Sequence, residues 1–99
     1  MAKIYKLYLV HRATEAWYAL SETEQHQLFE KVDQALAQAG GQRLVQCDSA
    51  WSSEQCPAFG VEVLPDLEAA QKHTKLLNDL NWYRYLESPS VLGTESTMG

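Results

Sequence analysis

The sequence has few cysteines, no excess of positive charge and no long hydrophobic run, and each shortage excludes a class of protein. Two cysteines and three isolated histidines offer none of the spacings that zinc sites use, so we expect no bound metal. Eight basic against thirteen acidic residues give a formal net charge of −5, the opposite of what binding to phosphates requires. No apolar run approaches the roughly 20 residues of a membrane-spanning helix. We therefore expect neither nucleic acid nor membrane as a partner.

Signals for export and for common cofactors are also lacking. Tyr5, Lys6 and Tyr8 interrupt what would be the apolar core of a signal peptide, so we expect a soluble, cytoplasmic protein. Cys47 and Cys56 fit that compartment as free thiols, although they flank a predicted hairpin and a disulfide stays open. The sequence contains no glycine-rich phosphate loop, no Ser-His-Asp order and no EF-hand loop, and we expect no cofactor.

The clearest feature that is present is a helix predicted over residues 20–39. Ser21 and Glu24 have the spacing of a capping box, in which each side chain satisfies a free backbone donor of the first turn. One apolar stripe follows at helical spacing, formed by Leu28, Phe29, Val32, Ala35, Leu36 and Ala39. Gly40 and Gly41 then supply the conformational freedom that a helix C-terminus uses.

The rest of the chain predicts four strands and a second helix. The strands are expected at residues 3–11, 42–51, 59–64 and 82–87, and the second helix runs from an Asp66 cap to Asn81. This order predicts an α+β fold, a ferredoxin-like βαββαβ sandwich with a four-stranded antiparallel sheet and two helices on one face. Residues 1–88 form the single predicted domain, and residues 89–99 a C-terminal tail.

The sheet is expected to need a second cover, because its strands carry large side chains on both faces. The face without helices is expected to hold Tyr8, Val10, Trp51 and one register of residues 82–85. Exposed apolar patches of several hundred Å² normally mark an interface or a ligand groove. We expect a two-fold homodimer with the open faces opposed and a cavity between them.

Several segments together resemble a known superfamily. They are AWYALSETEQ before and into the first helix, the tryptophan of CDSAW, the VEVLPDLEAA passage and the closing WYRYLE. Over residues 3–88 the sequence resembles the dimeric α+β barrel superfamily, and its AW-x-x-LS-x-x-E pattern is most similar to darcynin-like proteins, whose activity is not established. The superfamily includes cofactor-free monooxygenases, haem-degrading monooxygenases, muconolactone isomerases and ligand-sensing domains. Trp51 matches one haem-site residue, but no matching set accompanies it.

Two residues are candidates for catalysis. Arg84, predicted in the middle of the fourth strand, could anchor a carboxylate, phenolate or enolate, or could simply pair with Glu62. His11, at the end of the first strand, could act as a general base near neutral pH, or could be an ordinary solvated side chain. His73 interrupts the apolar stripe of the second helix, and we interpret it as a core histidine rather than a catalyst.

Four aromatic residues are candidates for binding a substrate. Tyr8 and Trp51 could form an aromatic wall, although packing alone would also explain them. In a strand, Tyr83 and Tyr85 would share one face and Trp82 and Arg84 the other, and the sequence does not decide which face meets the cavity.

These residues predict a protein that binds a small molecule, with two readings of its role. It is either a cofactor-independent enzyme of monooxygenase or isomerase type acting on an aromatic or polyketide-like substrate, or a non-catalytic protein that senses a ligand or only dimerises. The second reading is favoured by the absence of a close set of acid, base and nucleophile in the sequence.

Overall fold

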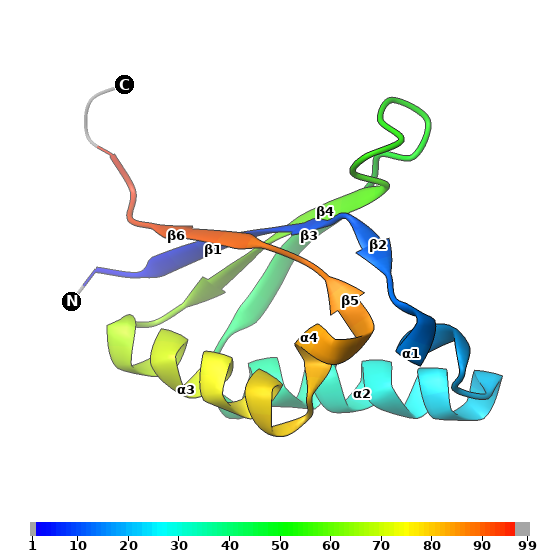
Figure 1. The fold of residues 1–99 in the computed structure, drawn as a ribbon. Helices are drawn as coiled ribbons and strands as arrows, with labels where there is room; N and C mark the ends of the chain where they lie inside the picture. The colour runs from blue at the N-terminus through cyan, green and yellow to red at the C-terminus, as the bar shows by residue number, and fades with distance from the viewer. Residues whose placement is uncertain (1, 97–99) are drawn as a thin grey trace.

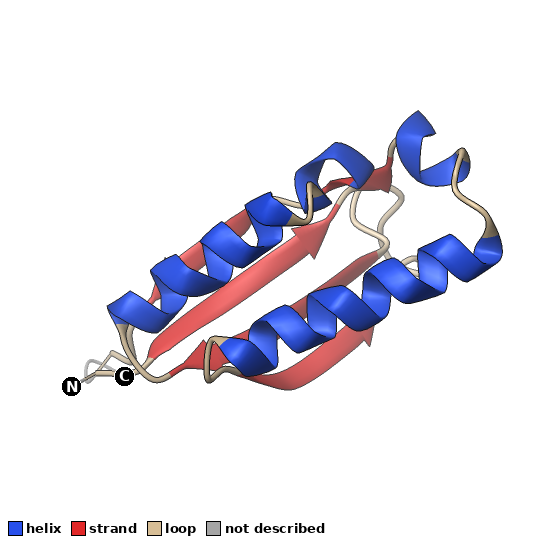
Figure 2. Cartoon of the chain, turned by 90° about the horizontal axis from the view of Figure 1, so that it is seen from below, coloured by secondary structure: helices blue, strands red, loops and turns tan. Residues whose placement is uncertain are grey.

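The computed structural model describes residues 2–96, which form an antiparallel sheet with helices packed on one face. The sheet contains β1 (Ile4–Val10), β3 (Gln42–Asp48), β4 (Ala58–Leu64) and β6 (Ser90–Gly93), in the order β3-β4-β1-β6. Helices α2 (Glu22–Gln38) and α3 (Leu67–Asp79) lie over the same face (Figures 1 and 2). The predicted α+β arrangement of four antiparallel strands and two main helices is confirmed.

Helix α2 begins and ends as the sequence predicts. The Ser21 side chain accepts a hydrogen bond from the Glu24 N–H at 3.1 Å, and Glu24 Oε1 accepts one from the Ser21 N–H at 2.9 Å. Gly40 follows the helix at a φ of 81°, in the left-handed region that glycine adopts without strain. Helix α3 has a simpler cap, in which Asp66 Oδ1 accepts a hydrogen bond from the Ala69 N–H at 2.8 Å.

Residues 82–87 are the main error of the predicted fold. Trp82–Tyr85 form a short helix, α4, and Leu86–Glu87 form β5, which pairs with β2 (Arg12–Ala13) in a separate two-stranded sheet. Asn81 at a φ of 56° turns the chain out of α3, and Trp82 is then buried in the core. The Thr14 hydroxyl donates to the Arg84 carbonyl oxygen at 2.7 Å, and this bond satisfies a carbonyl at the end of α4.

The fourth strand of the main sheet lies further along the chain, within the segment predicted to be a tail. β6 is antiparallel to β1, with Leu7 opposite Val91. The Leu9 N–H donates to the Pro89 carbonyl at 2.9 Å and the His11 N–H to the Glu87 carbonyl at 2.8 Å. These backbone hydrogen bonds align the segment before β6 along the edge of β1. Residues 97–99 of the predicted tail lie outside the described residues.

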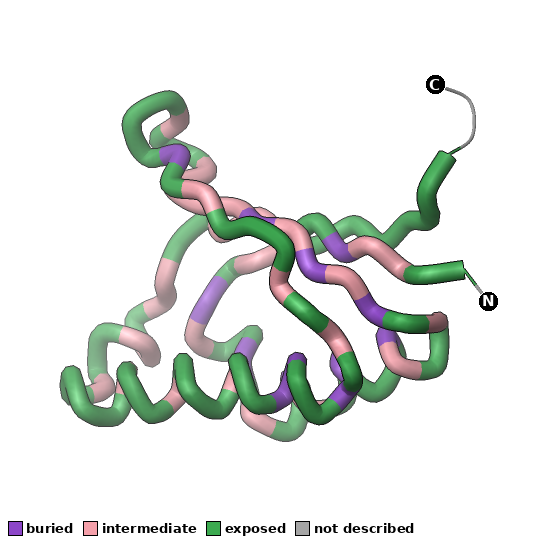
Figure 3. Tube along the Cα trace, turned by 180° about the vertical axis from the view of Figure 1, so that it is seen from behind, coloured by how far each residue is buried: buried purple, intermediate pink, exposed green. Residues whose placement is uncertain are grey.

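The hydrophobic core lies between the sheet and the helices, and Figure 3 shows the buried positions gathered there. One cluster contains Ala35, Leu77, Trp82 and Leu86, and a second contains Leu36, Ala39, Leu64 and Ala70. A short helix before α2, α1 (Glu15–Tyr18), adds Trp17 to the first cluster.

The residues expected on the open face of the sheet need correction. Val10 packs against the helix-side core, and Tyr8 lines a cavity with residues of α2 and α3. The opposite face instead carries the alternate residues of each strand, among them Leu7, Val45, Val61 and Val91. Trp51 lies on the loop between β3 and β4, which projects on the side away from the helices (Figure 1), and is 84% exposed.

Candidate ligand-binding site

The helix-facing side of the sheet carries polar side chains where hydrophobic ones are usual. Lys6 on β1 and Glu62 on β4 are cross-strand partners, and both are buried. Arg43 on β3 lies opposite Glu62 on its other side. Each of these positions shares its face with Tyr8, because the strand alternation brings every second residue to the same side. Charged groups are almost never buried unless they are paired, so this cluster needs an explanation.

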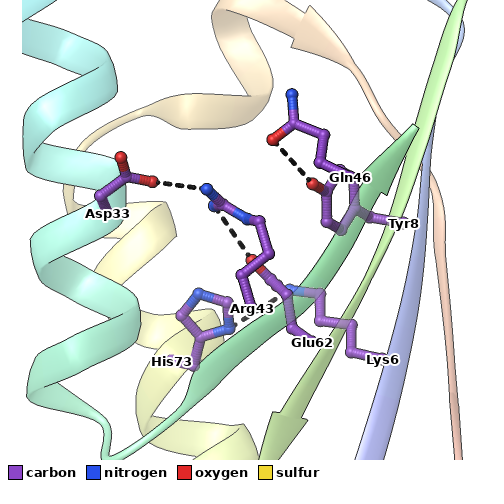
Figure 4. Close-up of polar contacts among 7 residues, drawn as sticks. All are labelled: Lys6, Tyr8, Asp33, Arg43, Gln46, Glu62 and His73. Carbon is purple, nitrogen blue, oxygen red and sulfur yellow. Dashed lines mark hydrogen bonds and ion pairs between the residues drawn. The ribbon is translucent and has the colours of Figure 1, made fainter. Parts of the chain in front are cut away.

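Arg43 links three elements through its guanidinium group (Figure 4). Its Nη1 lies 2.9 Å from Asp33 Oδ1 of α2, and its Nη2 lies 3.2 Å from Glu62 Oε2 of β4. Its Cζ is 5.9 Å from the centre of the Tyr8 ring, a cation–π distance. Arg43 Nε is buried and has no hydrogen-bond partner within the part of the chain that is described. The Glu62 side chain, which is only 6% exposed, is thereby paired with a positive charge.

Lys6 and His73 form a second polar pair deeper in the site. Lys6 Nζ lies 3.4 Å from His73 Nδ1, and both residues are buried, at 5% and 2% exposure. Burial, together with the positive charges of Lys6 and Arg43, lowers the pKa of His73 to about 4. Burial also lowers the pKa of Lys6, and the Glu62 carboxylate opposes that shift in part. At neutral pH His73 is therefore an uncharged imidazole.

A cavity of about 330 Å³ lies between the sheet and the helices, next to these charges. The polar residues of its lining are Lys6, Tyr8, Asp33, Arg43, Gln46, Glu62 and Ser88. The apolar and aromatic residues of its lining are Val10, Phe29, Val32, Leu77, Trp82, Tyr83 and Leu86. The rings of Phe29 and Trp82 meet edge to face, with centroids 5.9 Å apart, and Trp17 packs on both. The volume falls within the usual range for small-molecule sites, about 300–1,000 Å³.

The two tyrosines of the cavity keep their protons at neutral pH. Burial raises the pKa of Tyr8, an effect that the Arg43 charge partly offsets, and burial raises the pKa of Tyr83 as well. The Tyr8 hydroxyl donates to Gln46 Oε1 at 3.3 Å. Tyr8 lies across Gly60 of β4, where a Cβ atom would overlap its ring. Gly60 thus sets the position of the Tyr8 ring and the width of the cavity.

The structure brings two of the six predicted site residues to this cavity. Tyr8 and Tyr83 line it. His11 is exposed just after β1, and Arg84 is exposed on α4. Tyr85 is half-buried on α4 outside the lining, and Trp51 lies on its projecting loop. The alternatives for the two faces of a strand at residues 82–85 no longer apply, because this segment is helical.

Sequence reasoning missed the polar cluster itself, namely Lys6, Asp33, Arg43, Glu62 and His73. Its signals were present: Lys6 and Glu62 interrupt otherwise apolar strands, and His73 interrupts the apolar stripe of α3. These interruptions did not indicate a site, because the sequence predicts the cavity on the opposite face of the sheet. The interpretation of His73 as a core histidine is confirmed by its burial, at 2% exposure, beside Lys6.

Among residues 2–96 no group of three or more His, Cys, Asp or Glu side chains could hold a metal ion. No helix within that range has the length and apolar character needed to span a membrane.

Comparison with known proteins shows the fold alone. No protein-family model and no curated protein matches the sequence. A crystal structure of a protein of unknown function from Rhodopseudomonas palustris is similar, with a TM-score of 0.67 and 14% sequence identity, over 97% of this chain and 84% of that one. The similarity agrees with a small α+β fold.

Proposed function

We propose that this protein binds a small aromatic or polyketide-like molecule in the cavity between its sheet and its helices. The observation that carries the proposal is the mixed lining of that cavity, in which the buried Lys6 and Glu62 and the Arg43 guanidinium group accompany aromatic and aliphatic side chains. Ligand sites are mostly apolar hollows with a few placed polar groups.

The lining defines the chemistry of the ligand. Phe29 and Trp82 offer ring edges and faces to a planar apolar body. Tyr83 offers a neutral hydroxyl group that can donate to a carbonyl or phenolate oxygen, and Tyr8 can do so by giving up its hydrogen bond to Gln46. Arg43 adds a positive charge beside Tyr8. A flat molecule with an oxygen substituent at one end fits this mixed lining.

A cofactor-independent enzyme, of monooxygenase or isomerase type, is the catalytic form of the proposal. Such chemistry passes through an enolate or phenolate, which the charge of Arg43 and the tyrosine hydroxyls would stabilise. The sequence resemblance to dimeric α+β barrels, and to darcynin-like proteins among them, supports this form as an analogy of fold.

A non-catalytic ligand sensor is the second candidate, and a specific observation favours it. Asp33, Arg43 and Glu62 already satisfy one another, at 2.9 and 3.2 Å, so the cluster also has a structural reason to exist. A sensor would need only the shape and polarity of the cavity.

We further propose that the protein is a homodimer in the cytoplasm. The open face of the sheet exposes Leu7, Val45 and Val91 by 37%, 46% and 62%, and a second copy of that face would cover them. Both cysteines are free, as reduced thiols of the cytoplasm are.

Thermal shift with 2-naphthol tests the proposed binding. A ligand that binds only the folded state at ten times its Kd stabilises that state by about 1.4 kcal/mol, or a rise in Tm of about 5 °C or more for a domain of this size. Gly60→Ala adds a Cβ atom that overlaps the Tyr8 ring and so displaces this part of the cavity lining, and it should abolish the shift in Tm. Gly93→Ala is the control, because nothing lies within 4 Å of a Cβ added there.

The outcome separates the readings. An equal shift in both variants would place the ligand elsewhere, and no shift in the wild-type protein with either 2-naphthol or 2-naphthoate would overturn the proposal. Turnover of the bound compound, with or without consumption of oxygen, would favour the enzyme, and binding without turnover would favour the sensor.

A further inference from the structure

We propose that Lys6 is a nucleophile that forms a Schiff base with the carbonyl group of an aldehyde or ketone bound in the cavity. The inference rests on the proposed binding function and names the ligand class more closely: an aromatic or polyketide-like carbonyl compound. It assigns to Lys6 a covalent role that packing alone would not require.

Lys6 is a buried lysine held in the centre of the sheet. It lies in the middle of β1, between β4 and β6, so its backbone is held on both sides. Its side chain lines the cavity while remaining only 5% exposed, and Figure 4 shows it beside His73. The other lysines are Lys3, Lys31, Lys72 and Lys75, and all four are exposed to solvent. Lys6 therefore differs from every other amine side chain of the chain in its surroundings.

The nearest polar partner of the Lys6 amine is a neutral group and not a carboxylate. A buried lysine normally stays charged by pairing with a carboxylate, and Glu62 is its cross-strand neighbour. Arg43 occupies the Glu62 carboxylate instead, at 3.2 Å, whereas within residues 2–96 no ion pair joins Lys6 to Glu62. The contact of Lys6 Nζ is with the neutral imidazole of His73. A nucleophilic lysine needs this environment, because burial favours the free amine, and the Glu62 carboxylate that opposes this effect in part is already paired with Arg43.

The chemistry requires no oxidant or metal. The lone pair of the Lys6 amine attacks the carbonyl carbon, a C–N bond forms, and the π electrons of the carbonyl move to its oxygen. A proton passes from nitrogen to that oxygen to give a carbinolamine. The hydroxyl group of the carbinolamine then takes up a proton from solvent and leaves as water, while the nitrogen lone pair forms the C=N bond of a protonated imine. His73 Nδ1, 3.4 Å from Lys6 Nζ, is placed to accept and return the proton. Addition of water to the imine reverses the sequence.

A reductive trapping experiment tests this. The full-length protein is incubated at pH 7 with 2-naphthaldehyde and sodium cyanoborohydride, which converts an imine to a stable secondary amine, and peptides are then mapped by mass spectrometry. We expect the naphthylmethyl adduct on Lys6 at least tenfold faster than on Lys31, Lys72 or Lys75. Excess 2-naphthol should protect Lys6 and leave the exposed lysines unaffected.

Substitution provides the matched control. Lys6→Met should remove the fast adduct, and Lys31→Met should retain it. Circular dichroism of Lys6→Met checks its folding, and the mapping of the wild-type protein decides the question independently of that variant.

Each remaining outcome is decisive. Labelling in proportion to exposure, or no adduct on Lys6 while 2-naphthol still raises Tm, overturns the Schiff base and leaves the binding function in place. If neither 2-naphthol nor 2-naphthoate shifts Tm and Lys6 stays unlabelled by 2-naphthaldehyde, the binding function and the Schiff base are both overturned.

Discussion

Arg43 is the residue on which the polar site depends most. It joins α2 to β4 through its contacts with Asp33 and Glu62, and its guanidinium group lies by the Tyr8 ring. The Glu62 side chain is only 6% exposed, so without Arg43 its charge would remain in a region from which water is largely excluded. Removing one partner of a buried pair is far more damaging than removing one partner of a surface pair.

The first prediction compares these two cases. Arg43→Met should lower the free energy of unfolding by about 2–3 kcal/mol, somewhat below the about 3–5 kcal/mol of a fully buried pair because Arg43 is 29% exposed. Lys75→Met removes the exposed ion pair of Lys75 with Asp79, whose charged atoms are 3.1 Å apart. This variant should change the free energy of unfolding by less than about 0.5 kcal/mol. Urea unfolding at pH 7 measures both. Equal losses would contradict the structural role of Arg43.

His73 gives the folded protein a pH dependence of its own. Its pKa is about 4 when folded and about 6.5 when unfolded, so protonation favours the unfolded chain. The stabilising contribution is fully present above pH 6.5 and is lost as the pH falls toward 4. A shift of this size corresponds to about 3 kcal/mol in total.

The matching measurement is urea unfolding at pH 7 and at pH 4.5. His73→Gln should lose markedly less stability over this interval than the wild-type protein, because glutamine does not titrate. The exposed His26→Gln is the control and should follow the wild-type curve. The pKa of Glu24 is lowered by Ser21 and that of Glu87 by Arg12, so their protonation at low pH also destabilises the folded protein. This contribution is the same in all three proteins. Parallel curves for all three would contradict the assignment to His73.

Among the elements, those with local signals were predictable. The capping box of Ser21 and Glu24 fixed the start of α2, and the left-handed Gly40 fixed its end. Asp66 did the same for the start of α3. The hairpin of β3 and β4 followed from apolar alternation on either side of a polar loop. In these segments, local propensity and tertiary packing favour the same structure.

The segment after α3 was not predictable in this way. Its aromatic residues favour a strand, and a four-residue stretch is too short for its periodicity to separate strand from helix. Packing decided the matter, since a helical turn buries Trp82 against Trp17 and Phe29. β6 was not predictable either, because its four residues are all exposed and show no pattern of burial. Backbone pairing with β1 holds it in the sheet.

The candidate site was only partly predictable, because it depends on which face of β1 meets the helices. Both registers of that strand contain large side chains: Tyr5, Leu7 and Leu9 on one face, Lys6, Tyr8 and Val10 on the other. The more polar register is the buried one. It is satisfied by Arg43, Asp33 and His73, which come from three separate elements, and no local pattern indicates that they converge.

At the scale of the whole molecule, the two faces of the sheet have different tasks. The helix side encloses the polar cavity, while the other side presents exposed aliphatic residues and carries the projecting loop of Trp51 (Figure 1). The proposed dimer would cover this second face and leave both cavities within their own subunits. Its formation should therefore be separable from ligand binding.

The last prediction tests that separation by placing a charge on the open face. Val91→Asp should raise the dissociation constant of the proposed dimer at least about thirtyfold, or about 2 kcal/mol, because the interface would bury an unpaired carboxylate. The fold should persist, since Val91 is 62% exposed in the single subunit. Leu67→Asp is the matched control: Leu67 is 57% exposed on α3, on the helix side of the sheet, and its change should leave the association unaffected. Sedimentation equilibrium at micromolar concentration measures both variants. A monomeric wild-type protein, or a Val91→Asp protein that associates as tightly as the control, would show that the open face is not a dimer interface.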